Sequence, residues 1–155
     1  MNIKKIFIIF FLFTLNFTST YSLEADIFVQ STVNRASQIL SKDISKEEKI
    51  NELKSVAKET VDIIGVGFYS LGSIRKNLDK NQKKKYLVLF EDYFLKSFSS
   101  RLAEYANPEI EVKGKKVLNK NYTIVNSLLV GTSDRPEVKI DWRIYTKNPE
   151  NPLIR

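Results

Sequence analysis

The chain has 155 residues, contains neither cysteine nor histidine, and carries a formal net charge of +7. Its length suits one domain with a single sizeable core. The two missing residue types exclude disulfides, His- or Cys-ligated metal sites, cysteine nucleophiles and histidine acid–base catalysis.

The N-terminal segment has the layout of a secretory signal peptide. Lys4 and Lys5 precede an apolar run over residues 6–13, and small polar residues follow. A membrane-spanning helix needs about 20 predominantly apolar residues, which this run does not reach. We therefore expect residues 1–22 to be a signal peptide that is cleaved on export, and residues 23–155 to form the mature domain. An exported chain without cysteine is ordinary in the bacterial periplasm.

Two helices are predicted at the start of the mature domain. Apolar residues recur at helical spacing over residues 26–40, which predicts the first. Ser45 and Glu48 have the spacing of a capping box, and the apolar period then continues to Ile64 in the second. Glycines are expected to end this second helix and loosen the chain after it, at Gly65, Gly67 and Gly72.

The third predicted helix is long and apolar on more than one side. Asp79 and Gln82 repeat the capping pattern, and the helix is expected to run to about Tyr105, before Pro108. Its stretch LVLFEDYFLKSF, residues 87–98, has eight apolar or aromatic residues in twelve. So wide an apolar surface needs more than one neighbour. The pattern fits a helix at the centre of a compact core as well as one between a core and a cavity.

Segments with β-strand patterns follow the helices. Residues 110–118 and 137–145 alternate in part between apolar and polar side chains, and residues 121–130 are rich in β-branched ones. The expected turns are Gly114, residues 119–121 and residues 131–136. We therefore expect an α+β domain in which N-terminal helices pack on a C-terminal antiparallel meander.

The sequence predicts no catalytic site, metal site or cofactor. Glu91 and Asp92 are adjacent on a helix, so their carboxylates diverge. Gly65 and Gly67 follow a helix and lack the third glycine of a dinucleotide-binding motif. Lysines cluster at residues 83–85 and 113–116, where they could meet anionic lipid head groups or phosphates, although surface lysines are usually only solvated. The basic charge and aromatic content would also suit a nucleic-acid binder, which the export signal argues against.

The segment from Val61 to Tyr105 resembles the signature region of the MlaC family. The matching residues are Val61-Asp62, Leu71-Gly72, Gln82, Leu89-Phe90 and Arg101-Leu102-Ala103. The strand from Val138 to Ile144 also resembles the family's Val-x-Val-Asp-aromatic-Arg-Leu strand. Two features depart from the family: Ser73 and Ile74 stand where aromatic residues are usual, and family members continue past residues 153–155 with the rest of a final strand and a C-terminal helix.

The resemblance implies a non-enzymatic periplasmic carrier that maintains outer-membrane lipid asymmetry by moving a glycerophospholipid between the membranes. Its implied partners are an inner-membrane lipid ABC transporter and an outer-membrane complex, with no nucleic acid. Shielding the roughly thirty methylenes of two acyl chains, at about 0.8 kcal/mol each, needs an interior cavity between helices and sheet. The expected lipid-binding walls are Phe68, Leu71, Phe90, Phe94, Phe98, Ile124, Leu128, Ile140, Trp142 and Ile144. Arg143 or the lysine clusters are expected near the mouth of the cavity or at a docking surface.

Two alternatives remain open from the sequence. One is an interaction or scaffold domain with a solid core, for which the wide apolar surface of residues 87–98 is ordinary core. The other is a decayed, non-functional fragment of a carrier, because the last strand and C-terminal helix of the family are expected to be missing.

Overall fold

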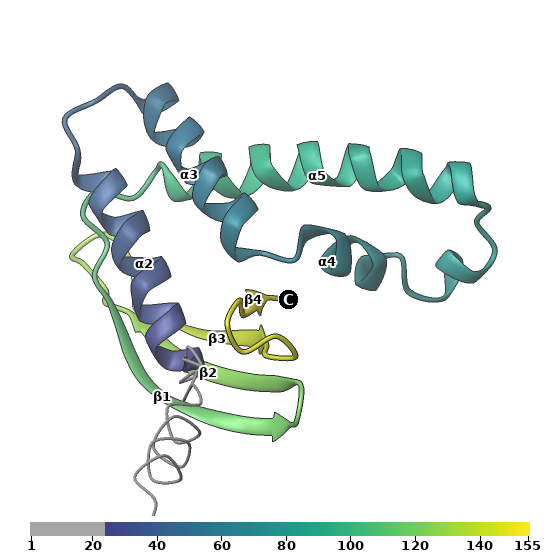
Figure 1. Ribbon diagram of the computed structural model, residues 1–155. Helices are drawn as coiled ribbons and strands as arrows, with labels where there is room; N and C mark the ends of the chain where they lie inside the picture. The colour runs from purple at the N-terminus through teal and green to yellow at the C-terminus, as the bar shows by residue number, and fades with distance from the viewer. Residues whose placement is uncertain (1–23) are drawn as a thin grey trace, which may run out of the picture.

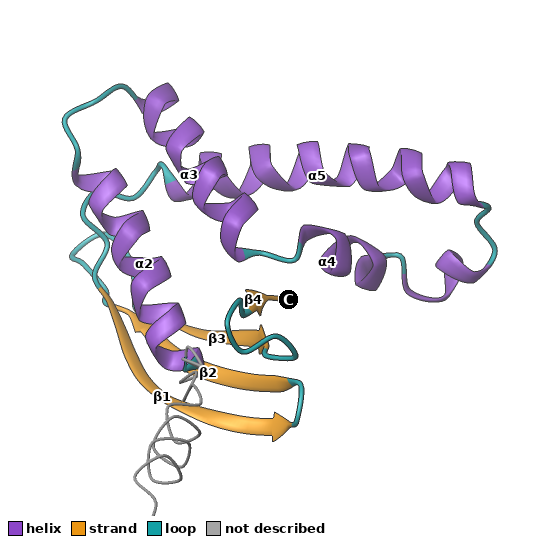
Figure 2. Cartoon of the chain, viewed as in Figure 1, coloured by secondary structure: helices purple, strands orange, loops and turns teal. Residues whose placement is uncertain are grey.

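The computed structural model describes residues 24–155 as a layer of helices followed along the chain by an antiparallel sheet (Figures 1 and 2). The predicted signal peptide lies outside the described residues. The expected α+β class is confirmed. In chain order the elements are α2 (Ala25–Ser41), α3 (Lys46–Thr60), α4 (Ile63–Ser70), the 3₁₀ helix η1 (Gly72–Lys76), α5 (Lys80–Leu102), β1 (Ile110–Asn119), β2 (Tyr122–Leu129), β3 (Val138–Tyr145) and β4 (Leu153–Ile154).

Helix α3 begins as predicted but ends earlier. Ser45 accepts a hydrogen bond from the Glu48 amide at 3.2 Å, and the Glu48 carboxylate accepts one from the Ser45 amide at 2.9 Å, which confirms the capping box. The helix ends at Thr60 rather than Ile64 because Asp62 caps a separate helix, α4, by accepting a hydrogen bond from the Gly65 amide at 2.9 Å.

The glycines predicted to end the second helix instead lie mostly inside α4. Gly67 is buried against α5, where an added Cβ would lie 3.0 Å from a ring carbon of Phe90 and 3.1 Å from a methyl carbon of Leu87. Close packing of two helices, and not chain termination, therefore explains this glycine. Only Gly72, with φ of +54°, stands at a helix end in a left-handed conformation.

Helix α5 opens with the predicted capping box. The Asp79 carboxylate accepts from the Gln82 amide, and the Gln82 side chain accepts from the Asp79 amide, each at 2.9 Å. The helix ends at Leu102, three residues short of the predicted Tyr105. Figure 1 shows α4 and the first half of α5 running side by side beyond the sheet, as an arm.

The sheet is a four-stranded antiparallel meander in the order β1-β2-β3-β4. Gly114 lies within β1 at a register shift rather than in the predicted turn. Helix α2 packs across β1 and β2, and its first turn is tied to β1 by Lys115, which contacts Glu24 and donates to Asp26 at 2.8 Å. This hydrogen bond lowers the pKa of the Asp26 carboxyl.

The buried residues form three separate clusters instead of one continuous core. The first lies between α2 and the sheet and includes Val29, Val125 and Ile144, all fully buried. The second joins α2 to α3 around Leu53. The third joins α3 and α4 to α5 around Leu95, with partly buried aromatic residues of α5 packed on it. Space is therefore left where the three clusters meet.

One buried group in the described part of the chain has no hydrogen-bond partner, the hydroxyl of Ser99 on α5. Removing such a group avoids its desolvation cost and also raises helix propensity. We expect Ser99→Ala to raise the free energy of unfolding by about 1 kcal/mol, measured by urea unfolding. The Ser100→Ala change, at a half-buried position on the same helix, should give only the smaller propensity gain. Loss of stability in Ser99→Ala would mean that the hydroxyl is satisfied in solution.

Candidate functional site

An apolar hollow of about 300 Å³ lies between the helix layer and the sheet, where the three clusters meet. Each neighbouring element contributes one side of it. The lining residues are Thr32, Val33, Ala36, Ser37 and Leu40 from α2; Leu53, Val56, Ala57 and Thr60 from α3, with Val61 after it; Phe98 and Leu102 from α5, with Tyr105 and Pro108 after it; and Ile110, Leu129, Val138, Ile140, Trp142 and Ile154 from the sheet.

The register of the sheet explains which strand residues reach the hollow. Ile110, Leu129 and Val138 are cross-strand partners in one row over three strands. Directly paired residues share a face, so all three point toward the helices. Ile140 and Trp142 lie further along β3 on the same face, opposite Ser127 and Val125 of β2.

The few polar groups around the hollow are mostly bonded within the protein. The hydroxyls of Thr32 and Thr60 donate to helix carbonyls one turn earlier, at 2.9 and 2.8 Å. Ser37 donates to the Pro108 carbonyl at 3.0 Å, and the Trp142 indole donates to the Ser127 hydroxyl at 2.7 Å. No Asp, Glu, Lys or Arg of the described chain lines the hollow. Its wall therefore offers a ligand hydrocarbon contact rather than charge.

Three of the residues predicted from the sequence line this hollow: Phe98, Ile140 and Trp142. Ile144 is fully buried in the cluster between α2 and the sheet and belongs to solid core. Phe90 and Phe94 pack against the third cluster, away from the lining of the hollow.

The other predicted residues lie elsewhere. Phe68 lines a separate surface depression between α4 and α5, and Leu71 is half-buried at the end of α4. Ile124 and Leu128 pair with Arg143 and Lys139, which puts all four on the sheet face opposite the hollow. Arg143, expected near the mouth, therefore lies over the Tyr122 ring on that opposite face, at 4.2 Å.

The stretch of residues 87–98 divides between three environments. Tyr86, Phe90, Phe94 and Phe98 form a ladder with ring centroids 5.4–6.1 Å apart, and only its last ring reaches the hollow. Leu95 is buried in the third cluster. Its remaining apolar side chains are mostly exposed: Val88, Leu89 and Tyr93 are each 61–69% accessible. The wide apolar surface of α5 is thus partly an outer surface.

Sequence reasoning missed the contribution of α2 and α3, which supply nine of the twenty lining residues. Val33, Leu40, Leu53 and Val56 were visible only as the regular apolar period of two helices. That period predicts burial without saying whether the buried face meets another side chain or an open space. Small residues beside it, such as Ala36 and Ala57, are the one signal for the space.

Within residues 24–155, no group of acidic side chains is arranged to hold a metal ion. In the same part of the chain, no helix is both long enough and apolar enough to cross a membrane.

The comparisons with known proteins agree with this architecture. A solved structure described as the phospholipid-binding protein from Ralstonia solanacearum in complex with a phospholipid is similar, with a TM-score of 0.69. The identity is 14%, over 85% of this chain and 75% of that one, so the likeness concerns the fold. No curated protein matches. The family model for the MlaC protein matches residues 30–154, and the chain therefore belongs to the MlaC family.

Proposed function

We propose that this chain binds a glycerophospholipid by enclosing acyl tails in the hollow between α2, α3, α5 and the sheet. The observation that carries the proposal is the lining, which is apolar, lacks charged groups among the described residues, and has its hydroxyls largely bonded to the protein itself. Such a surface gains free energy from hydrocarbon and offers few partners to water. Membership of the MlaC family and the lipid-bound relative support the same ligand class.

The size of the hollow suggests that it widens on binding. Ligand pockets commonly measure about 300–1,000 Å³, and this one, at about 300 Å³, is at the lower end. The first cluster joins α2 to the sheet, whereas the buried residues of the third lie in α3, α4 and α5 and at Val61. The helices α3 and α5 can therefore separate from the sheet around the hollow without parting the buried residues of either cluster. We infer that a whole two-tailed lipid enters by such a separation, with its head group left near solvent.

The proposal extends to a carrier role in the periplasm. A cleavable signal peptide over residues 1–22 would export the chain, and the mature domain would move phospholipid between the membranes as part of the system that maintains outer-membrane asymmetry. Its docking partners would be the inner-membrane lipid ABC transporter and an outer-membrane complex. The work required is binding and release, so we propose a binding protein rather than an enzyme.

The test is a mass measurement on protein made with its own N-terminal segment and purified from the periplasmic fraction without detergent. Native mass spectrometry should show the mature chain plus the mass of a phospholipid, and the added mass should disappear under denaturing conditions. Protein that is exported and folded but never carries lipid would support the alternative of a solid-core interaction domain. Protein found only in the cytoplasm would contradict the proposed export.

A further inference from the structure

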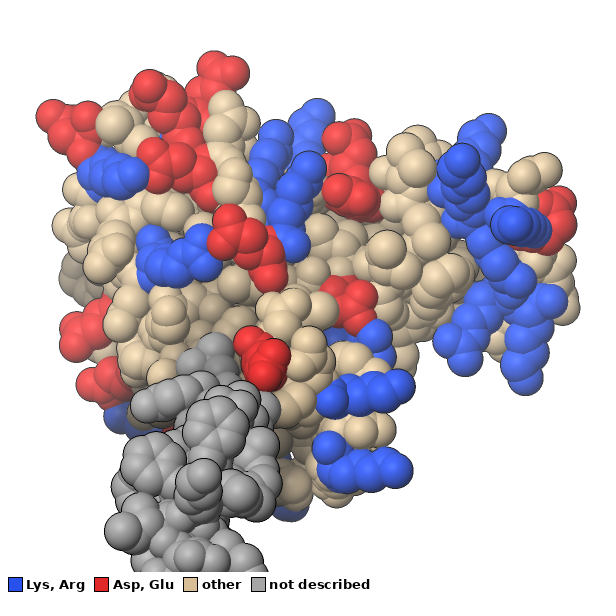
Figure 3. All heavy atoms as spheres, in the orientation of Figure 1, with Lys and Arg blue, Asp and Glu red and all other residues tan. Residues whose placement is uncertain are grey.

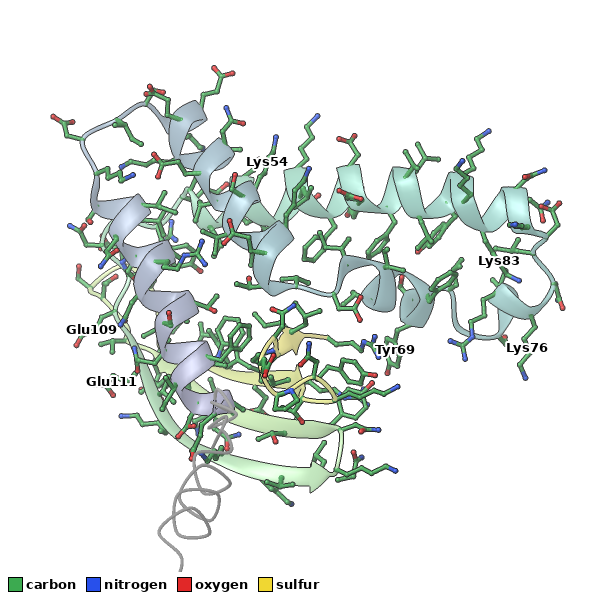
Figure 4. The ribbon with its side chains drawn as sticks, in the orientation of Figure 1. Lys54, Tyr69, Lys76, Lys83, Glu109 and Glu111 are labelled. Atoms are coloured by element: carbon green, nitrogen blue, oxygen red, sulfur yellow. The ribbon has the colours of Figure 1, made fainter. Side chains whose placement is uncertain are left out.

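The end of the arm formed by α4, η1 and α5 is strongly basic. We call it the tip and define it as residues 74–89. It carries six cations: Arg75, Lys76, Lys80, Lys83, Lys84 and Lys85. Within residues 24–155, none of the six makes an ion pair or a side-chain hydrogen bond. Figure 3 shows Lys and Arg side chains crowded at this end of the molecule, and Figure 4 shows Lys76 and Lys83 projecting from it.

The tip's only acidic side chain does not neutralise these charges through an ion pair. Asp79 is occupied as the N-cap of α5, where its carboxylate accepts from the Asn81 and Gln82 amides at 2.7 and 2.9 Å. The next acids along α5 are Glu91 and Asp92, and Glu91 is paired with Lys58 of α3. The six positive charges of the tip are therefore not paired with any acidic side chain of α5.

Exposed apolar side chains stand among the cations. Ile74 is 61% accessible, Val88 64% and Leu89 61%. Lys84 and Lys85 precede Val88 and Leu89 by four residues, so each lysine lies beside an aliphatic side chain on the helix surface. The same four residues, with Asn81, line a shallow depression on α5. None of the tip residues lines the hollow between helices and sheet, so the two surfaces are separate.

We propose that the tip docks on the surface of an anionic phospholipid membrane. Lysines attract anionic head groups, while neighbouring aliphatic side chains gain by entering the boundary between head groups and acyl chains. The combination of unpaired cations with exposed aliphatics favours this partner over a purely acidic protein surface, which would match the charges but not the apolar side chains. The surface would bring the carrier to a membrane independently of what the hollow contains.

Co-sedimentation with vesicles tests the electrostatic part. We expect binding to vesicles of phosphatidylcholine mixed with phosphatidylglycerol, little binding to phosphatidylcholine alone, and release at high salt. The triple change Lys83→Gln, Lys84→Gln and Lys85→Gln should lower the partition coefficient by roughly a hundredfold. Glutamine keeps helix propensity, and thermal unfolding should show that the variant is folded. The matched control removes the same charge from exposed positions on or beside the sheet, by Lys116→Gln, Lys120→Gln and Lys147→Gln. Its partition coefficient should fall much less.

A single-site label tests the apolar part. The chain has no cysteine, so Leu89→Cys can carry one polarity-sensitive fluorophore, with Lys120→Cys as the control position. When anionic vesicles are added, the fluorescence emission should shift to shorter wavelength only for the label at position 89. The proposal would be overturned by equal losses of vesicle binding in the two triple variants, or by equal emission shifts at the two labels. It would also be overturned if the unmodified protein did not bind anionic vesicles, and an acidic protein would then be the better partner for the tip.

Discussion

Phe98→Asp is expected to abolish copurifying phospholipid while leaving a folded domain. The ring is half-buried and forms one end of the aromatic ladder where it meets the hollow. A carboxylate there can be hydrated once no acyl tail occupies the space, so we expect a loss of stability of only about 2 kcal/mol. The same carboxylate would repel a hydrocarbon tail. Native mass spectrometry reports bound lipid, and thermal unfolding of delipidated protein reports stability, because ligand itself raises the apparent midpoint.

Ile144→Asp is the matched control, since it places the same charge in solid core. Ile144 is fully buried between α2 and the sheet. An unpaired carboxylate at that position costs about 4 kcal/mol or more, which is a large share of the stability of a small domain. We expect that variant to be largely unfolded. Unfolding of both variants to the same extent would show that Phe98 is also core, and a folded Phe98→Asp protein that still retains lipid would place the lipid elsewhere.

Local signals explain the parts of the fold that were predictable. The two capping boxes, at Ser45 and Asp79, fix helix starts through hydrogen bonds between residues three apart, which a sequence displays directly. The strands are similarly marked by β-branched residues in β2 and by alternation in β3. The order of helices and strands, and hence the α+β class, depends on these local features alone.

Features that depend on tertiary contacts were not predictable. Gly67 looked like a helix end because glycine is a poor helix former, yet the close approach of Phe90 gives it a place inside α4. The face of β2 was misjudged because Ile124 and Leu128 are its larger aliphatic residues, whereas the buried face carries Thr123 and Ser127 with Val125. Strand alternation gives two faces but does not say which one α2 covers.

The candidate site was only partly predictable for the same reason. An apolar stripe on a helix indicates that a face is covered, whereas a hollow is defined by the atoms that are absent between several covered faces. Phe98, Ile140 and Trp142 were found because they are large. The small residues that leave the space, such as Ala36, are a much weaker signal, because alanine is the best helix former and is ordinary in any helix.

Filling the hollow should reduce lipid binding and raise stability, whereas Phe98→Asp is expected to lower both. Ala36 lies on α2, is partly buried, and lines the hollow. Ala36→Phe would place a ring in open apolar space, where burying the added carbons favours the folded state; we expect lipid-free protein to gain about 1 kcal/mol. Because the ring occupies volume that acyl tails need, retained phospholipid should fall at least tenfold. A compact core would respond differently, since overpacking costs about 1–3 kcal/mol.

Ser31→Phe is the matched control for this substitution. It adds a ring to the same helix at an exposed position outside the hollow, so both lipid content and stability should stay close to those of the unmodified chain. Urea unfolding of delipidated protein and native mass spectrometry of freshly purified protein measure the two quantities separately. If Ala36→Phe is destabilised and Ser31→Phe is not, the space between α2, α3 and the sheet is already filled in solution. The acyl tails would then bind outside this hollow, and the lipid retained by Ala36→Phe would be close to normal.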